Sequence, residues 1–471
     1  MLKRIGPVNG RDHSQITPEG AVCIIREADF PKPFPWELEY NCPVHENWNI
    51  VHTGRLIPEC HAIYVCNDNC LRGVIMTADE MKGEQQFSAV MPNERDSING
   101  RLEQVTIDGV SRVIDRLPYR PKAVQVFLVC MHHFVGADER YIFRQLRERY
   151  PDIFFMQCWM DPIMQKVAKT PEQKQRYQMM LPVQPLPENL FHVNVLGDDL
   201  PLPASCDIAR LLAGHHMILR QVQDCQTFAE YKAMGDGWLT LVRSSLAVYG
   251  VSSLSRASRR PYLYLSVPMT YEEIRLRLTE LMTLVYEKED ENRETSVAKK
   301  LAAEEVKAFA EREIPECEAA FARLREKLTG WSVALDYLGC VRPLSTARLL
   351  LDHGIRVTKV YADAFDPIEE QDYLWIREHA PMLSIASTNH PRARYVAPVE
   401  RGMKEKVLAI GPKAAFFENT VHFVNQIESA GDWGFDGIKC LISRIEEALQ
   451  EEKDPESIVP LKGLGWENCV E

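Results

Sequence analysis

The chain has 471 residues and a formal net charge of −12, with 45% hydrophobic and 26% charged residues. This balance is typical of a folded protein with a sizeable core, and the length suggests three domains of ordinary size. The acidic balance disfavours a general nucleic-acid binder, because contacts with phosphate need clustered Lys and Arg. No apolar run reaches the roughly 18 residues that a membrane helix needs. The first fifteen residues lack the apolar segment of a secretory signal, so we expect a cytoplasmic protein.

Buried strands alternate with helices along most of the chain. An extended arm is expected over residues 1–40, followed by a cysteine-rich loop. Apolar runs rich in β-branched residues predict strands at 123–130, 152–160, 189–198, 261–268, 331–339, 355–363 and 406–411. Helical spacing predicts helices at 97–116, 138–150, 207–217, after 268, at 296–328, 345–354 and 437–450. The helix at 296–328 is long and charge-laced, and we interpret it as a spacer between domains.

This alternation predicts an α/β fold of three Rossmann-like domains, with mostly parallel sheets flanked by helices. The expected boundaries are 41–187, 188–328 and 329–455, with a tail at 456–471. In such sheets functional groups lie in loops at the carboxyl ends of strands, where Cys130 and the loop 339–342 fall. A P-loop and a GxGxxG turn are both missing from the sequence, which disfavours nucleotide hydrolysis by that route and a simple NAD dehydrogenase.

Thirteen cysteines is a high count for a chain without secretory context, and it favours metal or redox chemistry over disulfides. Cys42, Cys60, Cys66 and Cys70 fall within one short stretch, and Cys130 closes a predicted strand. Thiolates on loops and strand ends are the ligands that an iron–sulfur cluster needs. A [4Fe–4S] cluster takes four ligands. With Cys42, Cys70 and Cys130 as three of them, the fourth could come from Cys60, from Cys66 or from a partner chain.

The order of these cysteines resembles the nitrogenase component 1-type proteins, a family that includes nitrogenase subunits, their cofactor-assembly scaffolds and dark-operative tetrapyrrole reductases. Cys42 with Pro43, then Cys70, then Cys130 after a buried strand match the family's three ligands of an interfacial cluster. Weaker matches follow in the same order over most of the chain, namely ERDSING (94–100), GAD (136–138), LGCVRP (338–343), IGPK (410–413) and WGFDG (433–437).

Two departures separate the chain from a true nitrogenase. The position of the cysteine that holds the catalytic cofactor falls on Ser244 or Ser245. The position of the cofactor histidine falls near Val424, with His422 two residues away. A serine hydroxyl is a poor ligand for a soft metal site compared with a thiolate. We therefore expect no FeMo-type cofactor, and a nitrogenase-like protein in place of a nitrogenase.

The resemblance implies the catalytic component of an ATP-dependent reductase that acts on a small-molecule substrate. It implies a [4Fe–4S] cluster or an eight-iron, P-cluster-like species. It also implies a homodimer, or a heterodimer or α2β2 assembly with a homologous chain, and an ATP-hydrolysing [4Fe–4S] reductase protein as electron donor. The alternatives are a scaffold that assembles or stores a metallocluster and a non-catalytic partner subunit.

Three further residues are candidates for the catalytic machinery. His132 and His133 closely follow Cys130, and they could shuttle protons or serve as satisfied partners within the core. Arg342 lies in the loop after a predicted strand, where its guanidinium could contact an anionic substrate or a cluster sulfur. The alternative for Arg342 is a salt bridge that pins the loop.

Overall fold

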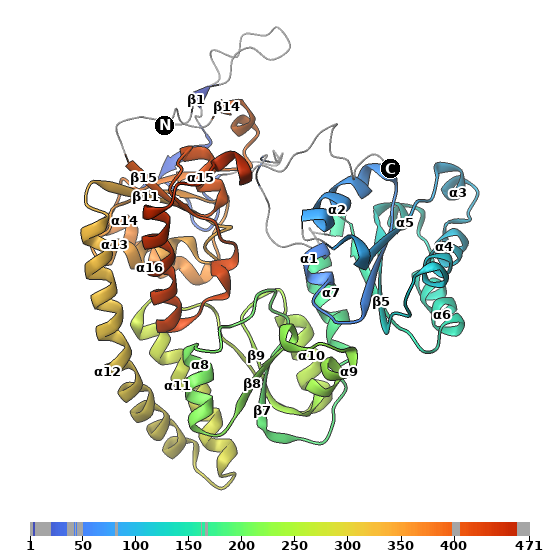
Figure 1. The fold of residues 1–471 in the computed structure, drawn as a ribbon, viewed down its shortest axis with the longest axis horizontal. Coiled ribbons are helices and arrows are strands. Elements are labelled where there is room, and N and C mark those ends of the chain that lie inside the picture. Colours follow the sequence, from blue (N-terminus) through green and yellow to red (C-terminus); the bar gives the residue numbers. More distant parts are fainter. Residues whose placement is uncertain are drawn as a thin grey trace. The chain divides into compact units, whose positions relative to one another are not determined.

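The computed structural model describes residues 3–4, 20–34, 42, 44, 50–80, 83–161, 163–164, 168–397 and 406–458 (Figure 1). It has the predicted α/β class, with parallel sheets flanked by helices. Contacts divide the chain into two compact units. The first comprises Met1–Asn47, Leu202–Leu211 and Val267–Lys462, and the second comprises Trp48–Pro201, Leu212–Ser266 and Gly463–Glu471.

The first sheet of the second unit is fully parallel, with strand order β4-β3-β5-β6. Its strands are β3 (Cys60–Val65), β4 (Phe87–Val90), β5 (Ala123–Val129) and β6 (Phe154–Met160). Every residue of β5 is buried, because helices cover both faces of the sheet.

Alternate residues of these strands face two different helix layers. One face packs on α4 (Leu102–Arg116) and α6 (Glu139–Arg149), and the other packs on α1 (Ile50–Gly54), α2 (Asp68–Glu80) and α7 (Pro171–Met180) (Figure 1). This two-residue period is the ordinary alternation of a strand. Two short helices flank the sheet, α3 (Glu94–Ile98) and α5 (Cys130–Val135).

The second sheet of this unit is also parallel, with strand order β10-β9-β7-β8. Its strands are β7 (Asn189–Val195), β8 (Ile218–Gln221), β9 (Gly237–Val242) and β10 (Tyr262–Tyr264). The helices in this part of the chain are α8 (Asp207–Gly214), α9 (Phe228–Ala233) and α10 (Val248–Ser258). One hydrophobic cluster contains residues of both sheets, so the two sheets share a core.

The first unit is built on a sheet with strand order β16-β15-β11-β12-β13-β2. Its strands are β2 (Val22–Ile24), β11 (Trp331–Asp336), β12 (Val357–Tyr361), β13 (Ser384–Ala386), β15 (Lys406–Ile410) and β16 (Phe423–Val424). Only β2, at the edge, is antiparallel to its neighbour among these described strands. A separate antiparallel pair joins β1 (Lys3–Arg4) to β14 (Val396–Ala397).

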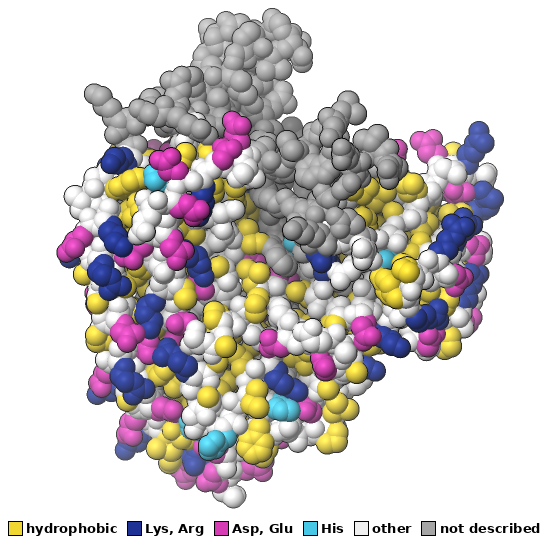
Figure 2. Space-filling model, viewed as in Figure 1, with side chains coloured by type: hydrophobic (Ala, Val, Ile, Leu, Met, Phe, Trp, Pro, Cys, Tyr) yellow, Lys and Arg dark blue, Asp and Glu magenta, His cyan; other side chains and the backbone are white. Residues whose placement is uncertain are grey.

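Among the described residues, six α-helices lie wholly within the first unit, namely α11 (Tyr271–Glu289), α12 (Thr295–Lys327), α13 (Pro343–Asp352), α14 (Glu370–His379), α15 (Pro412–Glu418) and α16 (Gly434–Gln450). The long helix α12 confirms the one predicted at 296–328. It packs along α11 and α16 within this unit. Basic and acidic side chains are interspersed along the outer face of α12, at the left of Figure 2.

Each of the seven predicted strands overlaps an observed one. The third sheet also takes in β2, which lies in the segment predicted as an extended arm. The prediction of a cysteine-rich loop was wrong for its second half, which forms β3 and α2. The strand was missed because CHAIYV is buried on both faces and shows no alternation of polar and apolar residues. Within the described part of the chain, no helix is long and apolar enough to cross a membrane.

Candidate functional site

Three cysteines meet at the carboxyl edge of the first sheet. Cys66 directly follows β3, Cys70 lies in the first turn of α2, and Cys130 directly follows β5. The strands β3 and β5 are neighbours, and the next strand after each lies on the opposite side, β4 beside β3 and β6 beside β5. Such a switch point is where open α/β sheets bind their ligands. We refer to Cys66, Cys70 and Cys130 as the cysteine crevice.

The thiols of the crevice influence one another. Burial raises the pKa of Cys66 to about 12, and the charge of Cys70 adds to this effect. Burial also raises the pKa of Cys70, with a further contribution from the charge of Cys130. Among the described residues, none forms a disulfide with these three cysteines, and none accepts a hydrogen bond from their thiols. A metal ion or cluster bound by these cysteines would take them as thiolates.

The residues of the crevice fit an iron–sulfur cluster in their chemistry. Among the described residues, no group of three or more His, Cys, Asp and Glu side chains is arranged to hold a single metal ion. A cluster differs from a single ion because each of its thiolates binds a separate iron, which places the sulfurs farther apart. Two thiols at the ends of two paired strands, with a third in the first turn of α2, suit that requirement.

Cys60 lies outside the crevice, and Cys42 belongs to the other unit. Cys60 begins β3 and Cys66 follows its last residue, so the strand separates them by about 20 Å, at about 3.3 Å per residue. One cluster cannot bind both. Cys42 belongs to the other unit, where it is fully buried in a hydrophobic cluster with Ala334, Tyr361 and Phe417.

His132 is committed to bonds within the fold. Thr106 donates its hydroxyl to the carbonyl of Leu102 at 2.7 Å, so it must accept from Nε2 of His132, 3.1 Å away. The other ring nitrogen, Nδ1, accepts from the backbone N–H of Val129 at 3.3 Å. Burial lowers the pKa of His132 to about 4. The ring is thus a neutral structural group with both nitrogens in use.

His133 differs from its neighbour because half of its side chain is exposed. Its Nδ1 lies 2.9 Å from Oδ2 of Asp161, a buried carboxylate that directly follows β6. A carboxylate on Nδ1 fixes the tautomer and leaves Nε2 for another partner. The pair is therefore suited to holding or passing a proton beside the crevice.

Polar side chains close the equivalent switch point of the second sheet, between β7 and β9. Asp198 accepts from the backbone N–H of Ser244 at 2.9 Å and from Nε of Arg243 at 3.0 Å. Arg243 also donates to the carbonyl of Leu200 at 2.7 Å. The predicted position of a cofactor cysteine is therefore occupied by a serine in a loop that a buried carboxylate holds.

The switch point of the third sheet, between β11 and β15, is closed in a similar way. Asp336 ends β11 and accepts from the backbone N–H groups of Gly339 and Ala414, both at 2.7 Å. Burial raises its pKa to about 6. Gly411 has a φ of +105°, and a Cβ there would clash with the Asp336 carboxylate. The two loops consequently pack directly on each other.

Arg342 forms a buried ion-pair hub. Its guanidinium donates to Glu273 at 2.6 Å, to Asp372 at 3.3 Å and to the carbonyl of Val267 at 2.9 Å. Its Nε donates to Ser345 at 3.0 Å. These bonds match the alternative of a salt bridge that pins the loop, because they occupy every side of the guanidinium fork.

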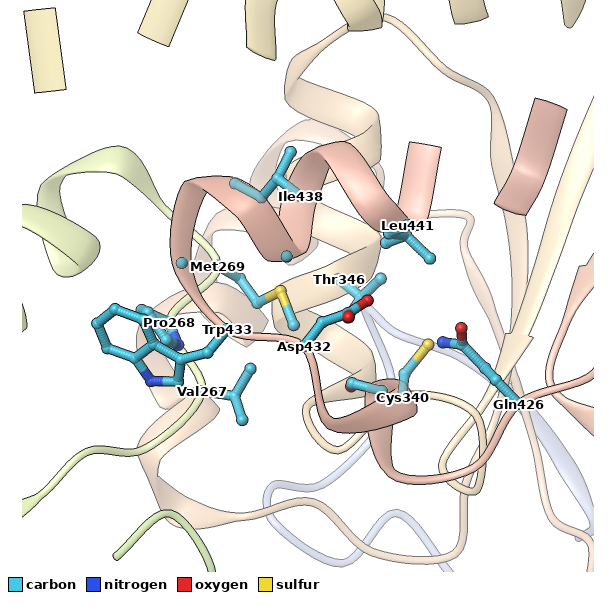
Figure 3. Close-up of a pocket in the computed structure, with 13 residues that line it drawn as sticks. Val267, Pro268, Met269, Cys340, Thr346, Gln426, Asp432, Trp433, Ile438 and Leu441 are labelled. Carbon is cyan, nitrogen blue, oxygen red and sulfur yellow. The ribbon is translucent and has the colours of Figure 1, made fainter. Parts of the chain in front are cut away.

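A pocket lies next to this hub in the first unit. Figure 3 shows Trp433 and Val267 at one end and Cys340 and Gln426 at the other. The polar side chains of its lining are already paired: Gln426 donates to Gly339, Asp432 binds Arg444, Thr346 donates to the carbonyl of Arg342, and Ser429 accepts from Val341. The polar side chains of the lining therefore hold the surrounding loops together.

Comparison with known proteins identifies the fold. No protein-family model matches the sequence, and no curated protein matches it significantly. Among solved structures, nitrogenase Cp1 at pH 6.5 has a TM-score of 0.59 and 14% identity over 88% of this chain and 94% of that one. Nitrogenase Cp1 at pH 5 has a TM-score of 0.53 and 12% identity over 93% and 95%. The chain therefore has the nitrogenase component 1 fold.

One residue beside the crevice was not singled out by the sequence, and one candidate ligand was not separated from another. Asp161 was missed, although it directly follows the predicted strand at 152–160, where functional side chains of parallel sheets gather. The sequence did not distinguish Cys66 from Cys60 as a candidate ligand, because the strand between them was not recognised. The register of β3 on β5 separates the two cysteines.

Proposed function

We propose that this protein is the catalytic component of a nitrogenase-like reductase that holds an iron–sulfur cluster at the cysteine crevice. The supporting observation is that Cys70 and Cys130 meet at the switch point of a sheet, in a chain with the nitrogenase component 1 fold. Thiolates are the protein ligands of such clusters. Because a fold hosts many functions, the proposal depends on these side chains.

In this proposal Cys70 and Cys130 ligate a [4Fe–4S] cluster or an eight-iron species. The bound cluster would supply one-electron transfer to a small-molecule substrate. Cys42, the remaining cysteine of the family pattern, stays a prediction from the sequence. A FeMo-type cofactor is not proposed, because Ser244 and Ser245 offer hydroxyl groups where a soft metal needs a thiolate.

The chain's own contribution to reduction would be the supply of protons and the exclusion of water. His133 is the proposed proton donor, because Asp161 orients its ring and Nε2 faces outward from that bond. His132 would keep the segment after β5 in place through Thr106 and Val129. Arg342 would have a structural role.

Partners follow from the same proposal. An ATP-hydrolysing [4Fe–4S] protein would deliver the electrons, since this sequence has no P-loop of its own. A second copy or a homologous chain would complete a dimer or an α2β2 assembly.

The test is the iron and sulfide content of the anaerobically purified protein, with EPR spectra before and after dithionite. We expect about four irons per chain and a redox-active signal, both lost in Cys70→Ala. Cys225→Ala is the matched control, because that thiol already has Gln221 and Met234 as partners. Near-zero iron after anaerobic reconstitution would refute the proposal. A cluster that passes to an acceptor apoprotein without turnover would instead support the scaffold.

A further inference from the structure

We propose that Cys66 is a ligand of the same cluster, so that one sheet edge supplies three thiolates through Cys66, Cys70 and Cys130. This assignment rests on the proposed function and deepens it. The family pattern places a single ligand, Cys70, in this stretch of the chain, so the resemblance does not imply Cys66.

The position of Cys66 is set by the sheet. Its backbone N–H donates to the carbonyl of Val90 at 3.0 Å, which extends the pairing of β3 with β4 by one residue. On the other side, Val65 pairs with Leu128 of β5. Two residues beyond Leu128 the chain reaches Cys130, so Cys66 and Cys130 emerge from neighbouring strands at the same edge.

The position of Cys70 is set by the turn into α2. The helix begins at Asp68, and the backbone N–H of Cys70 donates to Oδ1 of Asn67 at 3.2 Å. This bond satisfies one of the free N–H groups of the first turn. The first turn of α2 thus starts directly after β3, so Cys70 lies within one helical turn of the end of that strand.

Mutual electrostatic effects agree with this placement. The charge of Cys70 acts on Cys66, and the charge of Cys130 acts on Cys70. These pairwise effects accord with the placement of all three residues at one edge of the sheet.

The alternative is that Cys66 is an ordinary core cysteine. The other cysteines of this sheet show what that looks like: Cys158 has the side-chain oxygen of Gln125 at 3.9 Å, and Cys60 has the carbonyl of His61 at 4.0 Å. Cys66 is buried in the same hydrophobic cluster as Cys158, so burial does not separate the two. It differs in its position, because it follows the carboxyl end of β3, whereas Cys60 begins β3 and Cys158 lies within β6.

The test compares iron content and EPR spectra of anaerobically purified Cys66→Ala with those of the wild type, Cys70→Ala and Cys130→Ala. We expect Cys66→Ala to lose at least half of the iron, as the other two do. Cys60→Ala is the matched control, because it removes a thiol from the opposite end of the same strand and should keep the iron. Cys66→Ser keeps the side-chain volume, and we expect it to change the EPR signal because oxygen replaces sulfur on one iron.

Several results would overturn the assignment while leaving the proposed function intact. One is wild-type iron and an unchanged EPR signal in both Cys66 variants, alongside loss in Cys70→Ala. Another is a disulfide between Cys66 and Cys70, found by mass spectrometry in protein that carries its full iron. If circular dichroism shows that Cys66→Ala does not fold, the iron content and EPR spectrum of Cys66→Ser decide whether Cys66 is a ligand. Absence of iron from the wild type would refute the proposed function itself.

Discussion

Replacing Arg342 tests whether its role is structural. Arg342→Met removes the cation between Glu273 and Asp372 and leaves both carboxylates in a buried setting. Removing one partner of a buried ion pair typically costs about 3–5 kcal/mol. Asp372 keeps a second cation, because Arg348 lies 2.9 Å from its other oxygen. We therefore expect the lower end of the range, about 3 kcal/mol.

The assay is differential scanning calorimetry of the anaerobic protein. A loss of about 3 kcal/mol lowers the melting temperature of a unit of this size by about 6–12 °C. Lys307→Met, on the exposed face of α12, is the control, and its pair with Glu311 should contribute less than about 1 kcal/mol. Arg342→Lys should fall between the two, because an ammonium group cannot reach all the acceptors of the guanidinium fork.

A double-mutant cycle with Glu273→Gln isolates the ion pair. If the hub is structural, removing the Glu273 charge in the Arg342→Met background restores part of the lost stability, because a buried carboxylate without a cation is no longer left behind. An Arg342→Met protein that melts within 1 °C of the wild type would refute this reasoning, and it would return Arg342 to the candidates for substrate binding.

Two further predictions concern the closed switch points. Burial raises the pKa of Asp336 from 3.8 to about 6, so the protonated side chain stabilises the folded state. This contribution is fully present below pH 4 and is lost as the pH rises through 6. The side chain of Asp336→Asn cannot ionise. In urea unfolding, the free energy of unfolding of this variant relative to the wild type should therefore rise by roughly 3 kcal/mol between pH 4 and pH 7. Gly197 has a φ of +86°, and a Cβ there would clash with Ala247, so Gly197→Ala should destabilise the protein by about 2–4 kcal/mol in the same assay. Gly214→Ala, where the Cβ meets nothing within 4 Å, should be neutral or stabilising.

The elements predicted from the sequence were those with strong local signals. The run that became β5 is apolar throughout, and the long helix α12 has sustained helical spacing with charges on its outer face. The strand β3 lacked such a signal, since Cys60 and His61 open it and its burial comes from helices far away in the sequence. Local propensity cannot show a strand whose stability comes from tertiary packing.

The residues of the candidate site divide in the same way, into those with a local sequence signal and those defined by tertiary contacts. Cys70 and Cys130 were singled out by their order and by the strand before Cys130. The choice between Cys60 and Cys66 depended on which end of β3 each occupies, and that requires the register on β5. The difference between His132 and His133 depended on Thr106 and Asp161, which lie far away in the sequence. Pairings of that kind leave no trace in the spacing of the residues.

The three switch points of the chain also differ in a way that bears on function. In the second and third sheets, Asp198 and Asp336 accept hydrogen bonds from the loops opposite, so their crevices are filled by the chain's own polar groups. A buried polar group without a partner is costly, which explains why those crevices are closed. At the cysteine crevice, we propose that an iron–sulfur cluster bound to the thiols plays this part. A ligand that binds only the folded state adds its binding energy to stability. Iron should therefore stabilise the unit that contains β3 and β5, and the loss of iron in Cys70→Ala should lower the melting temperature of that unit.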